Sequence, residues 1–512
     1  MTSPQVLSPQ YQATLEKCQD LLRLYNEVLD TLQQCGYDTP EASLHEVLLS
    51  GSQVKLHAFL APLRPGESST QSDDPLDAPQ SLPANGLPSV EQAGQQVSGN
   101  ELNASEPRTY WNCFEAGNRA KKRGSFKEAI QQYRLALKLD AKLPWPHLGI
   151  GEVYTSLARF EEAIESYTQA SRCDPNYPWA HHKKSQILSK LHRHDEAVEA
   201  ARQATEVDPS GIWFHCQLGN ALTTKGDTEE AIAAYQASAK QGALASGVDP
   251  AQLHWDFDNP RGPDFICPGF AKSGTTSLYE YIIQHPQVLP VAQKEPMFFN
   301  NHYDRGLEWY LSQIPPIPST LNCVTGEVST RYIEDPNAHR RLYQHFPQTK
   351  LILLLRNPSD RAISDYYMGI TRGYEIRTIE AAFDDELSVF QQEGIEGLLK
   401  INQRAKKGET SLPSYILGSL YASHIQRWML CFPKEQFLVL TSDEFYQTPE
   451  ITLSKVFQFL DLPNHQLSEY GKYNSGSYDQ SQAIHQRLTE FFYTQNQALE
   501  AIFDIDLSNW FS

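Results

Sequence analysis

The sequence predicts an α-helical solenoid of repeats, followed by an α/β domain of P-loop type whose central parallel sheet is flanked by helices. Small and aromatic residues recur every 34 residues between Tyr110 and about Ala245, as in helical repeat arrays. Downstream, short apolar runs alternate with helical patterns, which is typical of α/β sheets. A glycine-bounded loop from Gly269 to Gly274 joins one such run to a helix, and this layout places phosphate groups on backbone N–H groups.

The net charge, the cysteine spacing and the hydropathy of the chain argue against several classes of protein. The chain has 512 residues, enough for several domains, and a formal net charge of -19, whereas non-specific nucleic-acid binders are normally basic. Its eight cysteines are scattered without a C-x-x-C pair, which favours reduced thiols over disulfides or a zinc site. No secretory signal pattern is visible, and no apolar run approaches the ~20 residues of a membrane span. We therefore expect a cytoplasmic protein that binds no nucleic acid.

The N-terminal region is expected to hold two helices in residues 1–62. An apolar stripe runs along the first, from Tyr11 to Leu32, and the second spans about Pro40 to Phe59. The stripe could be a docking or dimerisation surface, or it could pack on the chain's own domains. Leu63 to Pro107 is rich in Pro, Ser, Gln and Gly and is expected to be a disordered linker.

Residues 108–245 are expected to form four repeats. Small residues share one phase, at Gly117, Gly151, Ser185 and Gly219. Alanines follow twelve positions later, at Ala129, Ala163, Ala197 and Ala231. This pattern is similar to tetratricopeptide (TPR) repeats, which usually present a concave groove to a protein or peptide partner. A purely architectural role, holding the next domain, is the alternative. Four histidines of this region are interpreted as solvated or groove residues rather than ligands: His181, His182, His192 and His194.

Residues 246–263 read as a turn-rich connector into the α/β domain. Strands are then expected at Phe265–Cys267, Asn322–Val324, Leu351–Leu355 and Phe437–Leu440.

The glycine loop has P-loop spacing, but Thr275 stands where a nucleotide hydrolase has its lysine. Lys272 lies inside the loop instead. The loop therefore suits a nucleotide with a shorter phosphate arm. The sulfuryl donor 3'-phosphoadenosine 5'-phosphosulfate (PAPS) fits, because its 5' arm carries a single phosphate. The alternative is a glycine turn before a core helix.

A second segment points to the same ligand. Lys350 to Leu355 is a continuous apolar run typical of a buried parallel strand. Arg356 follows at its carboxyl end, where open α/β sheets bind ligands, and Ser364 lies two helical turns further on. A guanidinium and a hydroxyl suit a phosphate monoester such as the 3'-phosphate of PAPS. Alternatively, the arginine pairs with Asp360 or Asp365.

The loop A-K-S-G-T-T-S-L resembles the 5'-phosphosulfate loop of PAPS-dependent sulfotransferases, and L-R-N-P-S-D-R-A-I-S-D-Y resembles their 3'-phosphate motif. The segments K-E-P-M-F-F and Y-D-R-G-L-E-W-Y resemble the heparan sulfate, or glycosaminoglycan-type, branch of that family. The resemblance covers about Asp264 to Leu460 and implies a sulfotransferase domain in residues 264–512.

The resemblance also implies the roles of individual residues. Glu295 stands where this branch carries its catalytic glutamate and would be the general base, although an exposed ion pair with Lys294 is the alternative. Lys272 would stabilise the leaving phosphate. The donors to the 5'-phosphosulfate would be Ser273, Gly274, Thr275, Thr276 and Ser277. The scheme needs no metal, and the favoured acceptor is a glycan.

Some positions depart from the family pattern. Relatives usually read E-K-(S/T) where this chain has Glu327–Ser329, so a lysine that helps hold the acceptor is absent, and Arg331 could substitute for it. Met297 stands where some heparan sulfate enzymes have a histidine. Lys472–Tyr478 is the candidate C-terminal donor loop, and Ser475–Ser512 is expected to be mostly a terminal helix.

The sequence therefore predicts a cytoplasmic PAPS-dependent sulfotransferase that acts on a hydroxyl or amine, with a TPR module for partner binding. Two alternatives remain. One is a P-loop nucleotide or sugar kinase, and the other is a non-catalytic TPR scaffold whose α/β domain only binds nucleotide.

Overall fold

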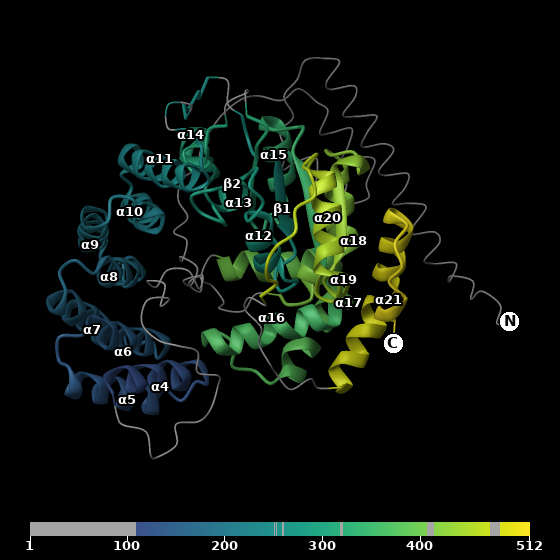
Figure 1. Ribbon diagram of the computed structural model, residues 1–512. Helices are drawn as coiled ribbons and strands as arrows, with labels where there is room; N and C mark the ends of the chain where they lie inside the picture. Colours follow the sequence, from purple (N-terminus) through teal and green to yellow (C-terminus); the bar gives the residue numbers. More distant parts are fainter. Residues whose placement is uncertain are drawn as a thin grey trace, which may run out of the picture. The chain divides into compact units, whose positions relative to one another are not determined.

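The computed structural model describes residues 109–249, 251, 253–258, 261–317, 321–406, 414–471 and 482–511 (Figure 1). The two helices expected in residues 1–62, the linker at 63–107 and the candidate donor loop at 472–478 lie outside these ranges.

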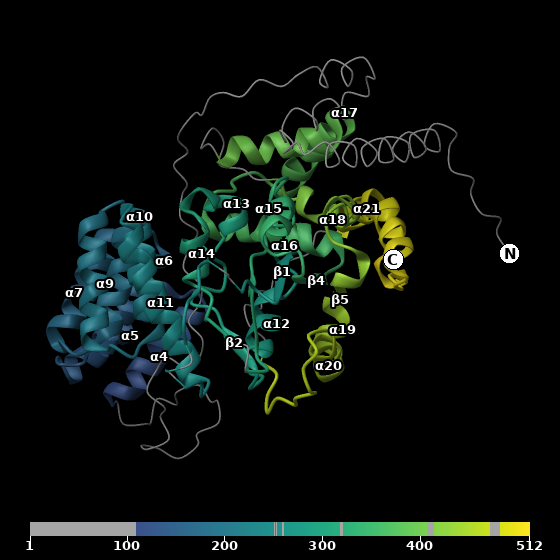
Figure 2. The same ribbon diagram turned by 90° about the horizontal axis from the view of Figure 1, so that it is seen from above.

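Four helical pairs confirm the predicted TPR solenoid. Figure 1 shows the pairs stacked in chain order, and Figure 2 shows the array from above. The pairs are α4 (Tyr110–Lys122) with α5 (Phe126–Leu139), α6 (Pro144–Ser156) with α7 (Phe160–Cys173), α8 (Pro178–Lys190) with α9 (His194–Val207), and α10 (Ile212–Lys225) with α11 (Thr228–Ala245). The small residues of the repeat lie against aromatic rings. A β-carbon at Gly117 would stand 2.6 Å from the Tyr133 ring, and one at Gly219 would stand 2.6 Å from Tyr235. The periodic small residues therefore let the two helices of a pair approach closely.

One histidine differs from expectation. His182 is buried and packs edge-on against Trp179 and Phe214, at ring-centroid distances of 5.3 and 5.7 Å. It faces the next repeat, so the interpretation as a solvated or groove residue is wrong for this side chain. Burial lowers its pKa to about 3. Among the described residues, no three His, Cys, Asp or Glu side chains lie close enough to hold a metal ion.

A five-stranded parallel sheet forms the centre of the second domain, as predicted. Its strands are β1 (Phe265–Gly269), β2 (Val288–Pro290), β3 (Val324–Val328), β4 (Lys350–Leu355) and β5 (Phe437–Thr441), in the order β2-β3-β1-β4-β5. The strand predicted at Asn322–Val324 was placed too early, since β3 begins at Val324 and runs to Val328. The central residues of β3, T-G-E, are not apolar, so a search for apolar runs does not detect them. The short edge strand β2 was not predicted, since it has three residues and ends in Pro290.

Helices cover both faces of this sheet (Figure 1). The longer ones are α12 (Thr275–Ile282), α15 (Ala338–His345), α16 (Pro358–Arg372), α17 (Ile379–Lys406), α18 (Tyr421–Met429), α20 (Pro449–Phe459) and α21 (Gln482–Phe503). Alternate residues of β4 point to opposite faces. Ile352 and Leu354 share a core with Leu278 of α12, whereas Leu353 shares one with Trp428 of α18. The sheet is thus buried on both sides, which explains its apolar strands.

The C-terminal part contains the expected long helix, α21, and ends with a 3-10 turn at Ser508–Trp510. None of the helices in the described ranges combines the length and apolarity that crossing a bilayer requires.

Candidate functional site

The glycine loop lies between β1 and α12, at the carboxyl edge of the sheet. Gly274 caps α12 with a φ of 99°, and Lys272 also has a positive φ, of 71°. A β-carbon at Gly274 would stand 2.5 Å from the Tyr446 hydroxyl, so both backbone conformation and space favour glycine. A glycine loop that leads into a helix N-terminus in this way favours a bound anion, through the backbone N–H groups and the helix dipole.

The polar side chains of the loop are enclosed. Ser273, Thr275 and Ser277 are buried, so their hydroxyls are shielded from water. Buried hydroxyls are normally paired in hydrogen bonds. The loop is therefore suited to an anionic group that accepts hydrogen bonds.

Ser442 fixes this loop to the sheet. Its Oγ lies 2.6 Å from the carbonyl oxygen of Ser273 and 2.9 Å from that of Leu355, the last residue of β4. The hydroxyl therefore joins the glycine loop to the end of the neighbouring strand. Ser442 begins α19 (Ser442–Gln447) directly after β5, so three strands contribute to one edge.

Arg356 leaves β4 at the same edge and lies next to the loop. Its Nη1 donates to the carbonyl oxygen of Lys272 at 3.3 Å, and the Tyr421 hydroxyl donates to the carbonyl oxygen of Arg356 at 2.8 Å. Asn357 then caps α16 by accepting from two backbone N–H groups of its first turn. Ser364 is buried in the second turn of that helix. The structure thus brings the two predicted cations, Lys272 and Arg356, together.

The two aspartates named in the alternative interpretation of Arg356 have other partners. Asp365 lies 3.2 Å from Arg361, and Asp360 lies 3.3 Å from His485.

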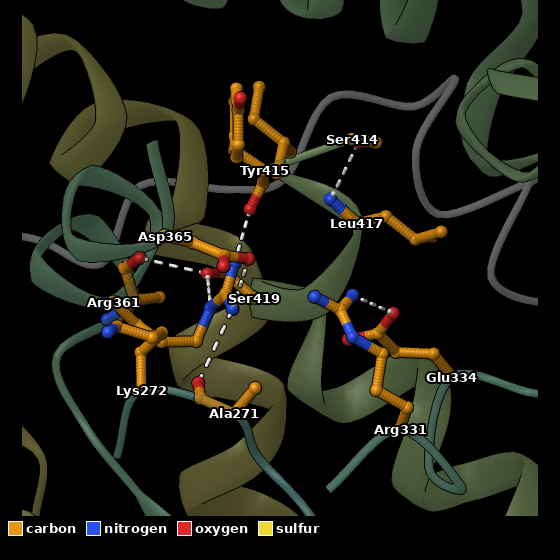
Figure 3. Close-up of polar contacts among 12 residues, drawn as sticks. Ala271, Lys272, Arg331, Glu334, Arg361, Asp365, Ser414, Tyr415, Leu417 and Ser419 are labelled. Atoms are coloured by element: carbon orange, nitrogen blue, oxygen red, sulfur yellow. Dashed lines mark hydrogen bonds and ion pairs between the residues drawn. The ribbon is translucent and has the colours of Figure 1, made fainter. Parts of the chain in front are cut away.

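Arg361 is a second arginine next to the loop, and its side chain is fully buried. Its guanidinium donates to the carbonyl oxygen of Ala271 at 3.4 Å, to the Ser419 hydroxyl at 2.6 Å and to the carbonyl oxygen of Tyr415 (Figure 3). Figure 3 places it between the loop and the segment that carries Tyr415 and Ser419. These contacts show that Arg361 links the loop to that segment.

Positive charge is concentrated around Lys272. Burial lowers the pKa of its ammonium group, Asp365 acts in the opposite direction, and Arg372, Arg356 and Arg361 lower it further. A bound anion would stabilise the charged form of a lysine whose neighbours are mostly cations. The loop edge is therefore an anion site by charge as well as by backbone geometry.

Glu295 is tied to this loop through Lys294. The Lys294 ammonium lies 3.3 Å from Glu295 Oε1 and donates to the Thr276 hydroxyl at 2.8 Å. The ion pair proposed as the alternative is therefore present. However, the Lys294 side chain is only 10% exposed and that of Glu295 only 26%. The pair is part of the site and not a solvated surface pair.

The segment behind Glu295 is held by β3 and by aromatic packing. The backbone N–H of Val328 donates to the carbonyl oxygen of Lys294 at 3.1 Å. Phe298 begins the short helix α13 (Phe298–Asn301) and stacks on Tyr310 of α14 (Leu307–Leu311), with ring centroids 4.7 Å apart. These contacts fix the carboxylate relative to the glycine loop.

Glu327 is a buried carboxyl next to this segment. The Tyr310 and Ser329 hydroxyls each donate to it at 2.6 Å, and Tyr332 does so at 3.3 Å. Burial raises its pKa to about 7, although these three hydrogen bonds act in the opposite direction. Arg331, the suggested replacement for the missing lysine, lies 3.4 Å from Glu334. Its proposed role toward an acceptor stays a prediction.

Lys294, Ser442, Tyr421 and Arg361 were not singled out by sequence reasoning as site residues. Lys294, Tyr421 and Arg361 lie inside segments that resemble sulfotransferases, so the resemblance could have pointed to them. Ser442 lies 169 residues from the loop residue that it contacts, so no local motif indicates this contact.

Comparisons with known proteins agree with this geometry. Residues 262–493 match the family profile described as sulfotransferase domain. Residues 117–157 and 151–191 match a TPR repeat profile, and residues 182–246 match a tetratricopeptide repeat profile.

Three curated relatives illustrate the similarity. A membrane-associated sulfotransferase, kil1, of Dictyostelium discoideum is 27% identical over 312 residues, which cover 48% of this chain and 66% of the relative. Human bifunctional heparan sulfate N-deacetylase/N-sulfotransferase 3 is 31% identical over 216 residues, covering 41% and 23%. Human heparan sulfate glucosamine 3-O-sulfotransferase 3A1 is 32% identical over 227 residues, covering 44% and 49%. The chain thus spans less than two thirds of the length of each of these relatives.

Proposed function

Because this chain joins TPR repeats to a sulfotransferase domain, we propose that it transfers a sulfuryl group from PAPS to a hydroxyl or amine, with a carbohydrate as the favoured acceptor. One observation carries the proposal. A glycine loop enclosed by cations is linked through Lys294 to a half-buried carboxylate, Glu295. The loop suits the donor and the carboxylate suits an acceptor proton, and the two stand side by side.

The donor site uses the residues at the carboxyl edge of the sheet. The backbone and hydroxyl groups from Ser273 to Ser277 would hold the 5'-phosphosulfate, and the buried hydroxyls of Ser273, Thr275 and Ser277 at the start of α12 support this assignment. Arg356 and Ser364 would hold the 3'-phosphate. Arg361 does not touch the nucleotide in this scheme and acts by supporting the loop.

The chemistry needs an acid-base group and a cation. Glu295 accepts the proton of the acceptor hydroxyl or amine while the acceptor atom bonds to sulfur. The bond between sulfur and the bridging phosphate oxygen breaks, and Lys272 stabilises the negative charge that develops on the departing phosphate. The products are the sulfated acceptor and 3',5'-adenosine bisphosphate. No step in this scheme uses a metal ion.

The acceptor and the partners are proposed on the comparisons. Relatives named as heparan sulfate sulfotransferases support a glycan acceptor, and the TPR repeats support a protein partner for the array. A cytoplasmic location stays a prediction.

Sulfuryl transfer from radiolabelled PAPS to heparan sulfate oligosaccharides tests the proposal. Glu295→Gln should lower kcat by roughly 100-fold to 10,000-fold, because it removes the general base. Lys272→Ala should lower it by roughly 100-fold to 1,000-fold. Binding of 3',5'-adenosine bisphosphate by the Glu295→Gln protein is the control for an intact donor site. Unchanged transfer in either variant would show that the assigned chemistry is wrong.

A further inference from the structure

The segment Ser414–Ser419 lies next to the glycine loop, and Arg361 joins the two (Figure 3). We call Ser414–Ser419 the support segment. The Arg361 guanidinium donates to the carbonyl oxygen of Ala271 in the loop and to the carbonyl oxygen of Tyr415 in the support segment. The Ser419 hydroxyl accepts from the same guanidinium at 2.6 Å and donates to a carbonyl oxygen at the start of α16 at 2.9 Å. The support segment is therefore linked to both motifs of the proposed donor site.

Glu386 of α17 binds the support segment as well. Its side chain is buried, and it accepts three hydrogen bonds from three consecutive residues. The backbone N–H groups of Tyr415 and Ile416 donate to it at 2.8 Å each, and the Ser414 hydroxyl donates at 2.7 Å. A carboxylate that accepts from two successive N–H groups fixes the backbone between them. The mechanism proposed above gives Glu386 no role.

The peptide group between Tyr415 and Ile416 is shared by the two networks. Its N–H, which belongs to Ile416, donates to Glu386. Its C=O, which belongs to Tyr415, accepts from Arg361. A peptide group is planar and trans, so its N–H and C=O point in opposite directions and turn together. If the N–H lost its partner and rotated, the carbonyl oxygen would move away from Arg361. The contacts therefore run from Glu386 through one rigid group to Arg361 and on to Ala271.

Water is excluded from these contacts. Tyr415, Ile416 and Leu417 are fully buried in a hydrophobic core that includes residues of α17. A peptide group in such a place must find another protein partner or move when it loses one. The Tyr415 hydroxyl has a separate contact, because it donates to Glu375 at 2.9 Å. That contact involves the side chain and not the peptide group, so the two can be removed separately.

We propose that Glu386 is a positioning residue of the donor site, which sets the conformation of the glycine loop through the Tyr415–Ile416 peptide group and Arg361. A loop that is held in its binding conformation before the ligand arrives loses less conformational freedom on binding. Glu386 thereby raises the affinity of the loop for its ligand without contacting that ligand. The identity of the ligand as PAPS rests on the proposed function, whereas the control of the loop by Glu386 does not.

Hydrogen–deuterium exchange in the full chain tests this control of the loop. At pH 8 most of the Glu386 carboxyl is ionised, because burial raises its pKa only to about 7. Glu386→Gln keeps the size of the side chain, but its amide nitrogen faces one of the two backbone N–H groups, and two donors cannot pair. The amides of Gly269–Gly274 should exchange at least ~5-fold faster in this variant, while those of α15 exchange as in the wild type.

Tyr415→Phe is the matched control, because it removes the hydrogen bond to Glu375 and leaves the peptide group intact. Its loop exchange should differ from that of the wild type by less than ~2-fold. Ser414→Ala removes only one of the three donors to Glu386 and serves where Glu386→Gln fails to fold. Its loop exchange should rise at least ~2-fold. Wild-type loop exchange in whichever of these two variants folds would overturn the proposal. Equal acceleration of the loop and of α15 would also overturn it, because that result indicates general destabilisation.

Affinity for 3',5'-adenosine bisphosphate, measured by isothermal titration calorimetry, extends the test to the ligand. The dissociation constant should rise at least ~5-fold in Glu386→Gln and less than ~2-fold in Tyr415→Phe. In the Arg361→Lys background, Glu386→Gln should add less than ~2-fold, because both residues act through the same contacts. Effects that multiply independently would overturn the proposed route through Arg361. Faster loop exchange in Glu386→Gln, together with no bisphosphate binding by the wild type, would reject the proposed function alone.

Discussion

Glu327→Gln replaces the buried carboxyl by a neutral side chain of the same shape. The folded protein holds the Glu327 proton more tightly than the unfolded chain does, because burial raises its pKa from an ordinary value of 4.5 to about 7. The folded state therefore binds more protons between these two pH values. The contribution of this carboxyl to stability is therefore greatest below pH 4.5 and is lost as the pH rises through about 7.

The size of this effect follows from the two pKa values. A carboxyl with a pKa of about 7 in the folded protein makes the free energy of unfolding about 2 to 3 kcal/mol lower at pH 8 than at pH 5. Glutamine cannot ionise, so this contribution is absent from the variant. Glu386 is a second fully buried carboxyl whose pKa is raised to about 7 by burial, and it should contribute a similar slope in both proteins.

Urea unfolding at pH 5, 6, 7 and 8 measures the difference. The wild type should lose stability over this range by about 2 to 3 kcal/mol more than Glu327→Gln does. Most of this extra loss should occur between pH 5 and pH 7, where the folded protein still holds the Glu327 proton and the unfolded chain has lost it. Parallel pH profiles would refute the assignment of a proton to the buried Glu327 carboxyl near neutral pH.

Two further substitutions test the loop and the repeat interface. Gly274→Ala should cost about 1 to 3 kcal/mol of stability and weaken the binding of 3',5'-adenosine bisphosphate. The residue has a left-handed φ, and an added β-carbon would collide with the Tyr446 hydroxyl. Gly124→Ala, which has a positive φ of 77° but open space, should lower thermal stability without changing nucleotide affinity. Trp309→Phe should destabilise the chain by about 1 kcal/mol by removing the hydrogen bond to Thr223 of the fourth repeat. Thermal unfolding measures this loss, and an unchanged Tm in Trp309→Phe would argue against the interface.

Much of the fold could be predicted because its signals are local. The repeat phases at Gly117 and Gly219 follow from close helix packing against Tyr133 and Tyr235, and such phases are visible in any single sequence. β1 and β4 are continuous apolar runs because both faces of the sheet are covered. The glycine loop is a local motif with its own spacing.

Contacts between distant segments could not be predicted. The hydrogen bond from Ser442 to the loop depends on the neighbouring positions of β4 and β5 in the sheet. The bridge from Lys294 to Thr276 depends on where the segment after β2 returns to the loop. The strand β3 was misplaced because its central residues are polar, and Glu327 is buried there only because Tyr310 and Ser329 supply partners.

The donor site is the central claim, and nucleotide binding tests it most directly. Thermal unfolding of the full chain should be measured with 3',5'-adenosine bisphosphate and, separately, with ATP, ADP and AMP. Saturation at 100 times the dissociation constant stabilises a protein by ~2.7 kcal/mol. A marked rise in Tm with the bisphosphate alone, reduced in Arg356→Ala, is the expected result. A rise with ATP and none with the bisphosphate would contradict the sulfotransferase assignment and favour a kinase.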